Sequence, residues 1–382
     1  MTSTRIQPAT TAPGRALGPD RGPGLDPGPH SALDPAAIRA AVDQRLQDFL
    51  DTKRRTAGDP LLASLTDHVR AFVMTGGKRV RPLLCVVGWH AAQGYGDMGP
   101  VITTAASLEL FHAFALIHDD LMDGSDLRRG RPTVHRALAA THPGHDEPTP
   151  AERFGVNGAV LVGDLVMVWS DEMLHTSGLH HRQLAAVRPL LDAMRTEVMI
   201  GQYRDLLTTG RPTENLESAL TVIRYKTAKY TVERPLHIGA AVAGADRHLL
   251  DTCTAYAIPI GEAFQLRDDL LGVFGDPRRT GKSTLDDLRE GKATVLMAHA
   301  LRRSTPRQAQ TLRTLVGDPG LDEGGAAVVR ELLRVTGAAD RVEAMIRARV
   351  DLARQTLDEA AFPDEVKSLL DTFATTAALR TS

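Results

Sequence analysis

Apolar residues recur at intervals of three and four positions along almost all of the chain after residue 35, and this spacing constrains the fold more than any other feature. Ile38, Val42 and Leu46 open the pattern, and residues 61–73 repeat it. This is the period of one helix face. We find no sustained alternation of apolar and polar residues of the kind that predicts a half-buried strand. The sequence predicts an all-α, single-domain helical bundle over residues 36–382.

Two of the predicted helices are apolar on more than one face, which is typical of buried central helices. They span residues 100–122 and 157–175. Further helices are expected at 180–208, 215–245, 248–275, 291–303, 306–316, 324–336 and 338–379. Gly- and Pro-rich breaks are expected at 76–77, 141–151, 210–213 and 276–284.

Residues 1–35 hold seven prolines and five glycines and show almost no apolar periodicity. Such a segment cannot bury enough apolar surface to offset the loss of chain entropy on folding. We therefore expect a disordered tail, for which a targeting or partner-binding role is the alternative to none.

The overall charge and the cysteine content exclude some classes of protein. The formal net charge of −2 over 382 residues excludes a general electrostatic attraction to nucleic acid. Cys85 and Cys253 are the only cysteines and lie in apolar contexts, so we expect two buried thiols in a reducing compartment. No uninterrupted apolar run reaches the length of roughly 18 residues that a membrane span needs. These features indicate a cytoplasmic protein without integral membrane association.

An aspartate-rich motif closes the apolar helix at 100–122. Asp119 and Asp123 are four residues apart, so their carboxylates share one helix face about 5–6 Å apart, and Asp120 lies further round. A cation between the two would turn their repulsion into attraction. Mg²⁺ prefers one or two carboxylates together with phosphate oxygens of a substrate. The motif therefore predicts a magnesium site rather than a solvated helix end.

A second motif repeats the arrangement near the end of the helix at 248–275. It carries Asp268 and Asp269, but the position four residues after Asp268 is Gly272. This half is expected to bind metal with fewer carboxylates, or with help from Asp276. We expect Gly272→Asp to change activity by only a few-fold.

Seven cations lie in segments around the two motifs, and together they carry enough charge for two diphosphates. They are Lys78, Arg81, Arg128, Arg129, Lys226, Lys282 and Lys292. Lys78 and Arg81 follow Gly76-Gly77 and are three residues apart, so we expect them on one face at the start of a helix, where anions bind well.

With these residues in place, the chain resembles the all-trans polyprenyl diphosphate synthases over roughly residues 36–378. The resemblance rests on five motifs in the family's order: Gly-Gly-Lys-Arg-x-Arg-Pro, the first Asp motif with its Arg-Arg-Gly, Lys-Thr, Phe-Gln-x-x-Asp-Asp and the final Gly-Lys-x-Thr. It implies a helical bundle with a central cavity, a homodimer, and transfer of an allylic group to isopentenyl diphosphate with the help of three Mg²⁺ ions.

The resemblance also implies a role for each matching residue. Asp119, Asp123 and Asp268 would bind metal, supported by Asp120 and Asp269. Arg128, Lys226, Gln265 and Lys282 would hold the allylic diphosphate, with Lys292 nearby. Lys78, Arg81, His112 and Arg129 would hold isopentenyl diphosphate, and the Thr227 oxygen would face the developing cation.

Product length is expected to depend on the helix that leads into Asp119. Ala115 and Phe114 lie about one turn, roughly 6 Å, below the metal site, and Phe111 lies near 12 Å. One aromatic and one small residue at the near positions resemble the synthases that stop at geranylgeranyl diphosphate, with farnesyl and geranylfarnesyl diphosphates as alternatives. Phe114 could instead be an ordinary core residue. The rival functions are a terpene cyclase, which needs no second diphosphate site, and a catalytically silent regulatory subunit.

Overall fold

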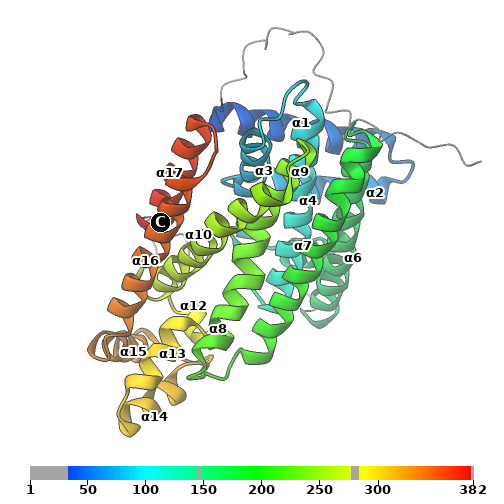
Figure 1. The fold of residues 1–382 in the computed structure, drawn as a ribbon. Helices are drawn as coiled ribbons and strands as arrows, with labels where there is room; N and C mark the ends of the chain where they lie inside the picture. Colours follow the sequence, from blue (N-terminus) through cyan, green and yellow to red (C-terminus); the bar gives the residue numbers. More distant parts are fainter. Residues whose placement is uncertain (1–32, 144–147, 277–283, 380–382) are drawn as a thin grey trace, which may run out of the picture. The chain divides into compact units, whose positions relative to one another are not determined.

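A computed structural model of the chain describes residues 33–143, 148–276 and 284–379, and most of these residues are helical (Figure 1). The prediction of an all-α fold is confirmed. The expected tail falls outside the described residues up to position 32, as does Lys282. The first helix begins at Pro35, with the Asp34 carboxylate accepting a hydrogen bond from the Ala36 amide.

The elements follow one another with short connections. In chain order they are α1 (Pro35–Thr56), α2 (Pro60–Met74), α3 (Val80–Ala91), α4 (Gly99–Met122), β1 (Leu127–Arg128), β2 (Arg131–Pro132), α5 (Val134–Thr141), α6 (Pro148–His175), α7 (His181–Thr208), α8 (Leu216–Ile223), the π-helix η1 (Arg224–Glu233), α9 (Arg234–Val242), α10 (Arg247–Phe274), α12 (Asp286–Glu290), α13 (Val295–Arg303), α14 (Pro306–Leu315), α15 (Glu323–Val335), α16 (Ala338–Glu359) and α17 (Asp364–Leu379).

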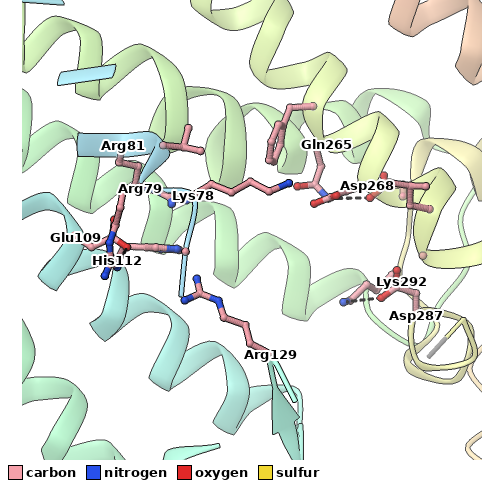
Figure 2. A pocket seen from close by; sticks show the side chains of 16 residues that line it. Lys78, Arg79, Arg81, Glu109, His112, Arg129, Gln265, Asp268, Asp287 and Lys292 are labelled. Atoms are coloured by element: carbon pink, nitrogen blue, oxygen red, sulfur yellow. Dashed lines mark hydrogen bonds and ion pairs between the residues drawn. The ribbon is translucent and has the colours of Figure 1, made fainter. Parts of the chain in front are cut away.

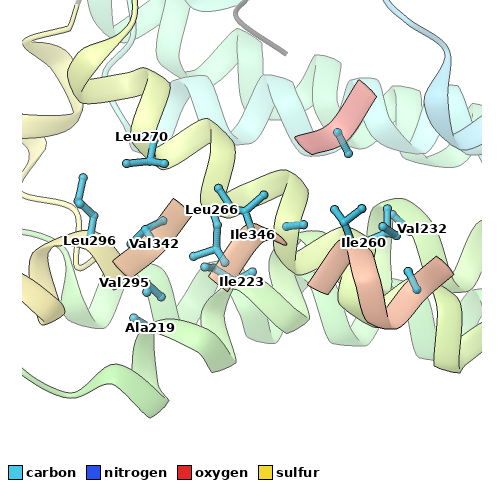
Figure 3. Close-up of a cluster of buried hydrophobic side chains, with 14 of the residues drawn as sticks. Ala219, Ile223, Val232, Ile260, Leu266, Leu270, Val295, Leu296, Val342 and Ile346 are labelled. Carbon is cyan, nitrogen blue, oxygen red and sulfur yellow. The ribbon is translucent and has the colours of Figure 1, made fainter. Parts of the chain in front are cut away.

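Two long helices organise the core. The helix α4 is buried on nearly every face, as its apolar sequence predicts, and packs against α6, α3 and α1. The helix α10 packs against η1 and α16, and its Leu266 and Leu270 belong to a cluster that includes Val295 and Val342 (Figure 3). Both Asp motifs lie near the C-terminal ends of these two helices, so the packing of the bundle positions the candidate site.

The segment predicted as one helix at 215–245 is three consecutive helical elements. Its middle, η1, is a π-helix with a wider turn. Neighbouring backbones approach it closely: a Cβ on Gly201 of α7 would lie 2.6 Å from the Lys226 nitrogen, and one on Gly261 of α10 would lie 2.3 Å from the Ala228 Cα. Only glycine fits at these two positions, so α7 and α10 hold η1 tightly between them.

Other departures from prediction are small. The expected helix 338–379 is interrupted after Glu359 and resumes at Asp364, and α6 starts within the expected break at 141–151. A two-residue antiparallel pair, β1 and β2, follows the first Asp motif. The two cysteines, Cys85 and Cys253, are buried and unpaired, as expected, and burial raises the pKa of each thiol to about 12.

Candidate active site

A cavity of about 600 Å³ separates a basic wall from an acidic wall. Figure 2 shows the cations of the 77–81 segment and Arg129 on one side, and Asp268, Asp287 and Lys292 on the other. The lining also includes Glu109, His112, Gln265, Asp269 and Gly272. The structure thus brings together residues of the second Asp motif, Arg129 from the segment after the first motif, and the Gly-Gly-Lys-Arg segment.

The loop that carries Lys78 is held in left-handed backbone conformations. The φ angles are 65° at Gly76, 133° at Gly77 and 47° at Arg79, and α3 begins only at Val80. Lys78 and Arg81 therefore do not share a helix turn, and that prediction was wrong, because glycines with positive φ delay the helix start. Both side chains nevertheless line the same cavity.

Buried hydrogen bonds of Arg79 hold this loop in place. Its guanidinium donates hydrogen bonds to Asp43 and Glu109, each at 2.7 Å, and to the carbonyl of Val73 at 2.9 Å. Only 4% of the Arg79 side chain and 7% of the Glu109 side chain are exposed. A buried, fully paired arginine of this kind fixes the backbone from which Lys78 projects.

The basic wall is built around one tyrosine. The Arg81 guanidinium lies 4.2 Å from the centre of the Tyr230 ring and donates to the Thr231 hydroxyl at 2.7 Å. The Tyr230 hydroxyl is 3.2 Å from His112 Nδ1. Burial, with added repulsion from Arg81 and Arg129, holds the pKa of His112 well below its usual value. His112 is therefore a neutral hydrogen-bonding group in this pocket.

Arg129 completes the basic wall and holds the loop of Gly76 and Gly77 by hydrogen bonds. Its Nη1 donates to the carbonyls of Thr75 and Gly76, at 3.0 and 2.6 Å. The backbone of Arg129 also has a positive φ of 54°, next to the short β1–β2 turn. The turn after the first Asp motif thus positions the Gly-Gly loop.

The first Asp motif forms the last turn of α4, where the Asp123 amide donates to the Asp119 carbonyl at 2.9 Å. Arg128 Nε donates to both carboxylate oxygens of Asp120, at 2.7 and 2.8 Å. Burial and the neighbouring Asp119 carboxylate raise the pKa of Asp123 to about 6. Burial also opposes ionisation of Asp119, but Lys226 and Arg128 outweigh it and lower the pKa of Asp119.

Lys226 and Thr227 of η1 connect the two motifs. Lys226 Nζ lies 3.2 Å from Asp119 Oδ1 and 2.7 Å from Asp205 Oδ2. The Thr227 hydroxyl donates to Gln265 Oε1 at 2.7 Å, and Gln265 Nε2 donates to Asp269 at 2.9 Å. This chain of bonds leaves the lone pairs of the Thr227 oxygen available to the cavity.

In the second Asp motif, Asp269 has a raised pKa, and the space beside Gly272 is occupied by another carboxylate. Burial is the main reason that the pKa of Asp269 rises to about 7. A Cβ on Gly272 would lie 1.9 Å from Asp287 Oδ2, so the Asp287 carboxylate occupies that space. Lys292 Nζ is 3.2 Å from Asp287 and 2.9 Å from Glu290. Burial lowers the pKa of Lys292, but these carboxylates outweigh it and raise that pKa.

A second cavity of about 760 Å³ adjoins the first and extends along α4. Its upper lining includes Asp119, Lys226, Gln265 and Asp268, which carry the chemistry just described. Its lower lining is mostly apolar and comes from three helices: Phe114 and Ala115 of α4, Met167 of α6, and Val198 and Met199 of α7. Phe111 is buried beneath Phe114, with ring centroids 5.3 Å apart, and does not appear in the cavity lining.

The carboxylates fit Mg²⁺ if a substrate completes the coordination. Asp119 Oδ1 is buried beside Lys226 at 3.2 Å, and burial together with the Asp119 carboxylate raises the pKa of Asp123, so a divalent cation between the two carboxylates would be favourable. Within residues 33–143, 148–276 and 284–379, no three His, Cys, Asp or Glu side chains gather closely enough to hold a metal alone. Mg²⁺ bound through one or two carboxylates and phosphate oxygens meets both observations.

Several site residues were missed by the sequence analysis. Asp205 contacts Lys226, and Asp287 fills the gap at Gly272, but each lies far in sequence from its partner. Arg79 and Glu109 form the buried pair below the loop. Asp205 lies three residues after Gln202, which lines the second cavity, so the two share one face of α7, but nothing in the sequence marks that face.

The sequence and the fold are similar to those of known prenyl diphosphate synthases. Residues 63–333 match the polyprenyl synthetase family. The chain is 32% identical over 335 residues to geranylfarnesyl diphosphate synthase of Aeropyrum pernix, covering 86% of this chain and 96% of that protein. It is 33% identical over 287 residues to octaprenyl diphosphate synthase of Escherichia coli, covering 75% of this chain and 77% of that protein.

A solved structure extends the similarity to the fold. It is that of geranylgeranyl pyrophosphate synthase from Corynebacterium glutamicum, complexed with isoprenyl diphosphate and magnesium, with a TM-score of 0.86 and 44% identity over 91% of this chain and 99% of that one. The family match also disagrees with the terpene cyclase interpretation. This chain belongs to the polyprenyl synthetase family and is a prenyltransferase of the all-trans polyprenyl diphosphate synthase type.

Proposed function

We propose that this enzyme condenses isopentenyl diphosphate head-to-tail with allylic diphosphates and releases geranylgeranyl diphosphate as its main product. The observation that carries the proposal is the pair of adjoining cavities. One has a basic wall at Lys78 and Arg81 beside Asp268, and the other passes from Asp119 into an apolar extension beside Phe114. The polar parts of the two cavities suit two diphosphates, and the apolar extension suits one hydrocarbon tail.

Each substrate has its own set of contacts in this proposal. Lys78, Arg81, His112 and Arg129 hold isopentenyl diphosphate. Arg128, Lys226, Gln265 and Lys292 hold the allylic diphosphate, and Asp119, Asp123 and Asp268 bind Mg²⁺, supported by Asp120 and Asp269. Mg²⁺, three ions by resemblance, supplies positive charge that favours departure of the diphosphate. His112 is neutral, so it donates a hydrogen bond without adding to the charge of the basic wall.

The condensation breaks the allylic C–O bond and forms a C–C bond to the double bond of isopentenyl diphosphate. Lys226 stabilises the negative charge that develops on the departing diphosphate. The Thr227 oxygen, oriented by its hydrogen bond to Gln265, faces the positive charge on carbon. The proton lost from the isopentenyl unit is taken by the released diphosphate, so no side-chain base is required.

Product analysis tests this function directly. The purified full chain is incubated with Mg²⁺, labelled isopentenyl diphosphate and either dimethylallyl, geranyl or farnesyl diphosphate, and the dephosphorylated products are separated by chromatography. We expect geranylgeraniol as the main product from all three primers. Mainly farnesol or geranylfarnesol would contradict the assigned length. No incorporation with any primer would contradict the condensation and favour a regulatory subunit.

We also propose that the enzyme is a homodimer that pairs through α6 and α7. Exposed apolar residues recur every seven positions on α6, at Phe154, Leu161 and Val168. The helix α7 repeats the spacing with the exposed pair Ile200 and Leu207. A seven-residue apolar repeat is the pattern by which helices pack on other helices. A second copy of the chain offers the same two helices in return.

Among the described residues, α6 is long and apolar enough to cross a membrane by length and composition, as is α4. The apolar window of α4 is 78% buried inside the protein, as in a core helix, whereas that of α6 is 39% buried. Burial of α6 in a dimer agrees better with the proposed cytoplasmic location.

Light scattering tests the dimer and should give twice the monomer mass for the wild-type chain. The double variant Leu161→Glu with Val168→Glu should give half that mass, whereas Leu352→Glu on α16 should not change it. A wild-type monomer would contradict the dimer.

A further inference from the structure

One helix turn below the apolar extension of the second cavity lies a layer that contains an ion pair. Three lining residues each have a neighbour one helix turn further from Asp119. These neighbours are Phe111 on α4, Asp171 on α6 and Arg195 on α7. Phe111 is three residues from Phe114, Asp171 is four from Met167, and Arg195 is three from Val198. Neighbours at these spacings lie one above the other on a helix.

The contacts join these three residues into one layer. Arg195 donates a hydrogen bond to Asp171 and so bridges α7 and α6. The Arg195 guanidinium also lies over the Phe111 ring, 5.5 Å from its centre. Phe111 in turn packs on Phe114, whose ring contacts His118 at 4.8 Å. The layer of Phe114 and the layer of Phe111 each contain an aromatic side chain, but only the Phe111 layer contains an ion pair.

The ion pair is only partly dehydrated. The exposed fractions are 20% for the Arg195 side chain and 41% for the Asp171 side chain, while Arg195 Nε is buried without a hydrogen-bond partner. A hydrocarbon tail that reached this layer would cover the charged groups and remove their remaining water without offering hydrogen bonds. That desolvation is unfavourable, whereas contact with Phe114 or Met167 is not.

We propose that the Asp171–Arg195 pair is a second stop for the growing chain, below the first stop at Phe114. This inference rests on the proposed function, because it concerns the length of the same product. With Phe114 in place, the tail ends above the pair. With Phe114 removed, the tail gains about one helix turn, roughly 5 Å or one isoprene unit, and then meets the charged layer.

The test compares product lengths in a Phe114→Ala background. Phe114→Ala alone should add one isoprene unit to the main product. Adding Asp171→Leu and Arg195→Met should extend the longest product by at least one further unit, because the floor is then apolar. Arg354→Met with Asp371→Leu, an ion pair between α16 and α17, is the matched control and should add nothing.

Two further variants separate charge from packing. Exchanging the charges, as Asp171→Arg with Arg195→Asp, should keep the length seen with Phe114→Ala alone. The apolar pair in the presence of Phe114 should leave the wild-type length unchanged. If the apolar pair lowers the melting temperature below the assay temperature, Phe114→Ala with Asp171→Asn and Arg195→Gln serves instead, and it too should lengthen the product because the layer is then uncharged.

The results distinguish this proposal from the proposed function. Active variants whose products stay equally long with and without the charges would overturn the second stop while leaving the condensation intact. Lengthening with Phe114 still present would overturn the order of the two stops. Absence of elongation in the wild-type chain would instead overturn the proposed function.

Discussion

The Asp287 carboxylate fills the space that a side chain at Gly272 would need. A Cβ on Gly272 would lie 1.9 Å from Asp287 Oδ2, far closer than atoms in contact approach, and 3.0 Å from its Cγ, which is tighter than most contacts. Asp287 also pairs with Lys292 at 3.2 Å. Asp287 of α12 therefore supplies a carboxylate to the second Asp motif at the position where α10 has none.

This relationship revises the expectation for Gly272→Asp. The new side chain must displace Asp287, so its contact with Lys292 is lost and the cavity wall shifts. We expect kcat/KM to fall about 10- to 100-fold, since displacements of this size near reacting groups have such effects. Steady-state kinetics over a Mg²⁺ titration measures it.

The double variant Gly272→Asp with Asp287→Gly is the control for this effect. It returns one carboxylate to the same space and should recover most of the lost activity. A single Gly272→Asp variant within a few-fold of wild type would show that the space is not occupied as described.

Asp119→Ala should lower turnover by about 100-fold or more. Asp119 lies 3.2 Å from Lys226 and belongs to the proposed cation site, so its loss weakens both that site and the position of Lys226. Turnover at saturating Mg²⁺ is the measurement. Asp126→Ala, at a carboxylate whose side chain is 69% exposed, is the matched control. Near-normal turnover by Asp119→Ala would exclude the first motif from the chemistry.

Lys78→Ala and Lys226→Ala should affect different substrates. Lys78 lines the basic cavity beside Arg81 and Arg129, whereas Lys226 lies between Asp119 and Asp205. We expect Lys78→Ala to raise KM for isopentenyl diphosphate about tenfold or more and Lys226→Ala to impair use of the allylic substrate. Kinetics with each substrate varied in turn tests the split. Equal effects of both variants on both substrates would count against two pockets.

The metal-free enzyme should be stabilised by Asp123→Asn at neutral pH. Burial and the Asp119 carboxylate raise the pKa of Asp123 in the folded state to about 6, from about 3.9 in an unfolded chain. The folded state thus keeps a proton that the unfolded state releases, so stability falls as pH rises from about 4 to about 6 and stays lower above that.

The asparagine variant removes this cost, which is on the order of 1 kcal/mol. In EDTA, its melting temperature should exceed that of wild type at pH 7.5 and equal it at pH 4. Asp351→Asn, at an exposed carboxylate of α16, should behave like wild type at both pH values. A difference of the same size at pH 4 would point to packing instead of charge.

The sequence predicted the features that depend on local pattern. The apolar faces of α4 identified it as a central helix, and the spacing of Asp119 and Asp123 placed both carboxylates on its last turn. It could not predict η1, because over ten residues a π-helix and an α-helix bury similar sets of side chains. Nor could it predict Asp287, since nothing in the sequence tells which carboxylate will fill the space beside Gly272.

Ala115→Phe should shorten the main product to farnesyl diphosphate. Ala115 lines the apolar extension one turn below Asp119, beside Phe114 and across from Met167. A phenyl ring at this position would fill the space into which a fourth isoprene unit extends, while leaving Lys226 and the carboxylates in place. Chromatography of the dephosphorylated products gives the distribution, and total isopentenyl incorporation shows whether the chemistry is intact. Ala115→Ser, which adds little volume, is the control and should keep the wild-type product. An unchanged distribution with Ala115→Phe would place the floor of the product cavity on another helix.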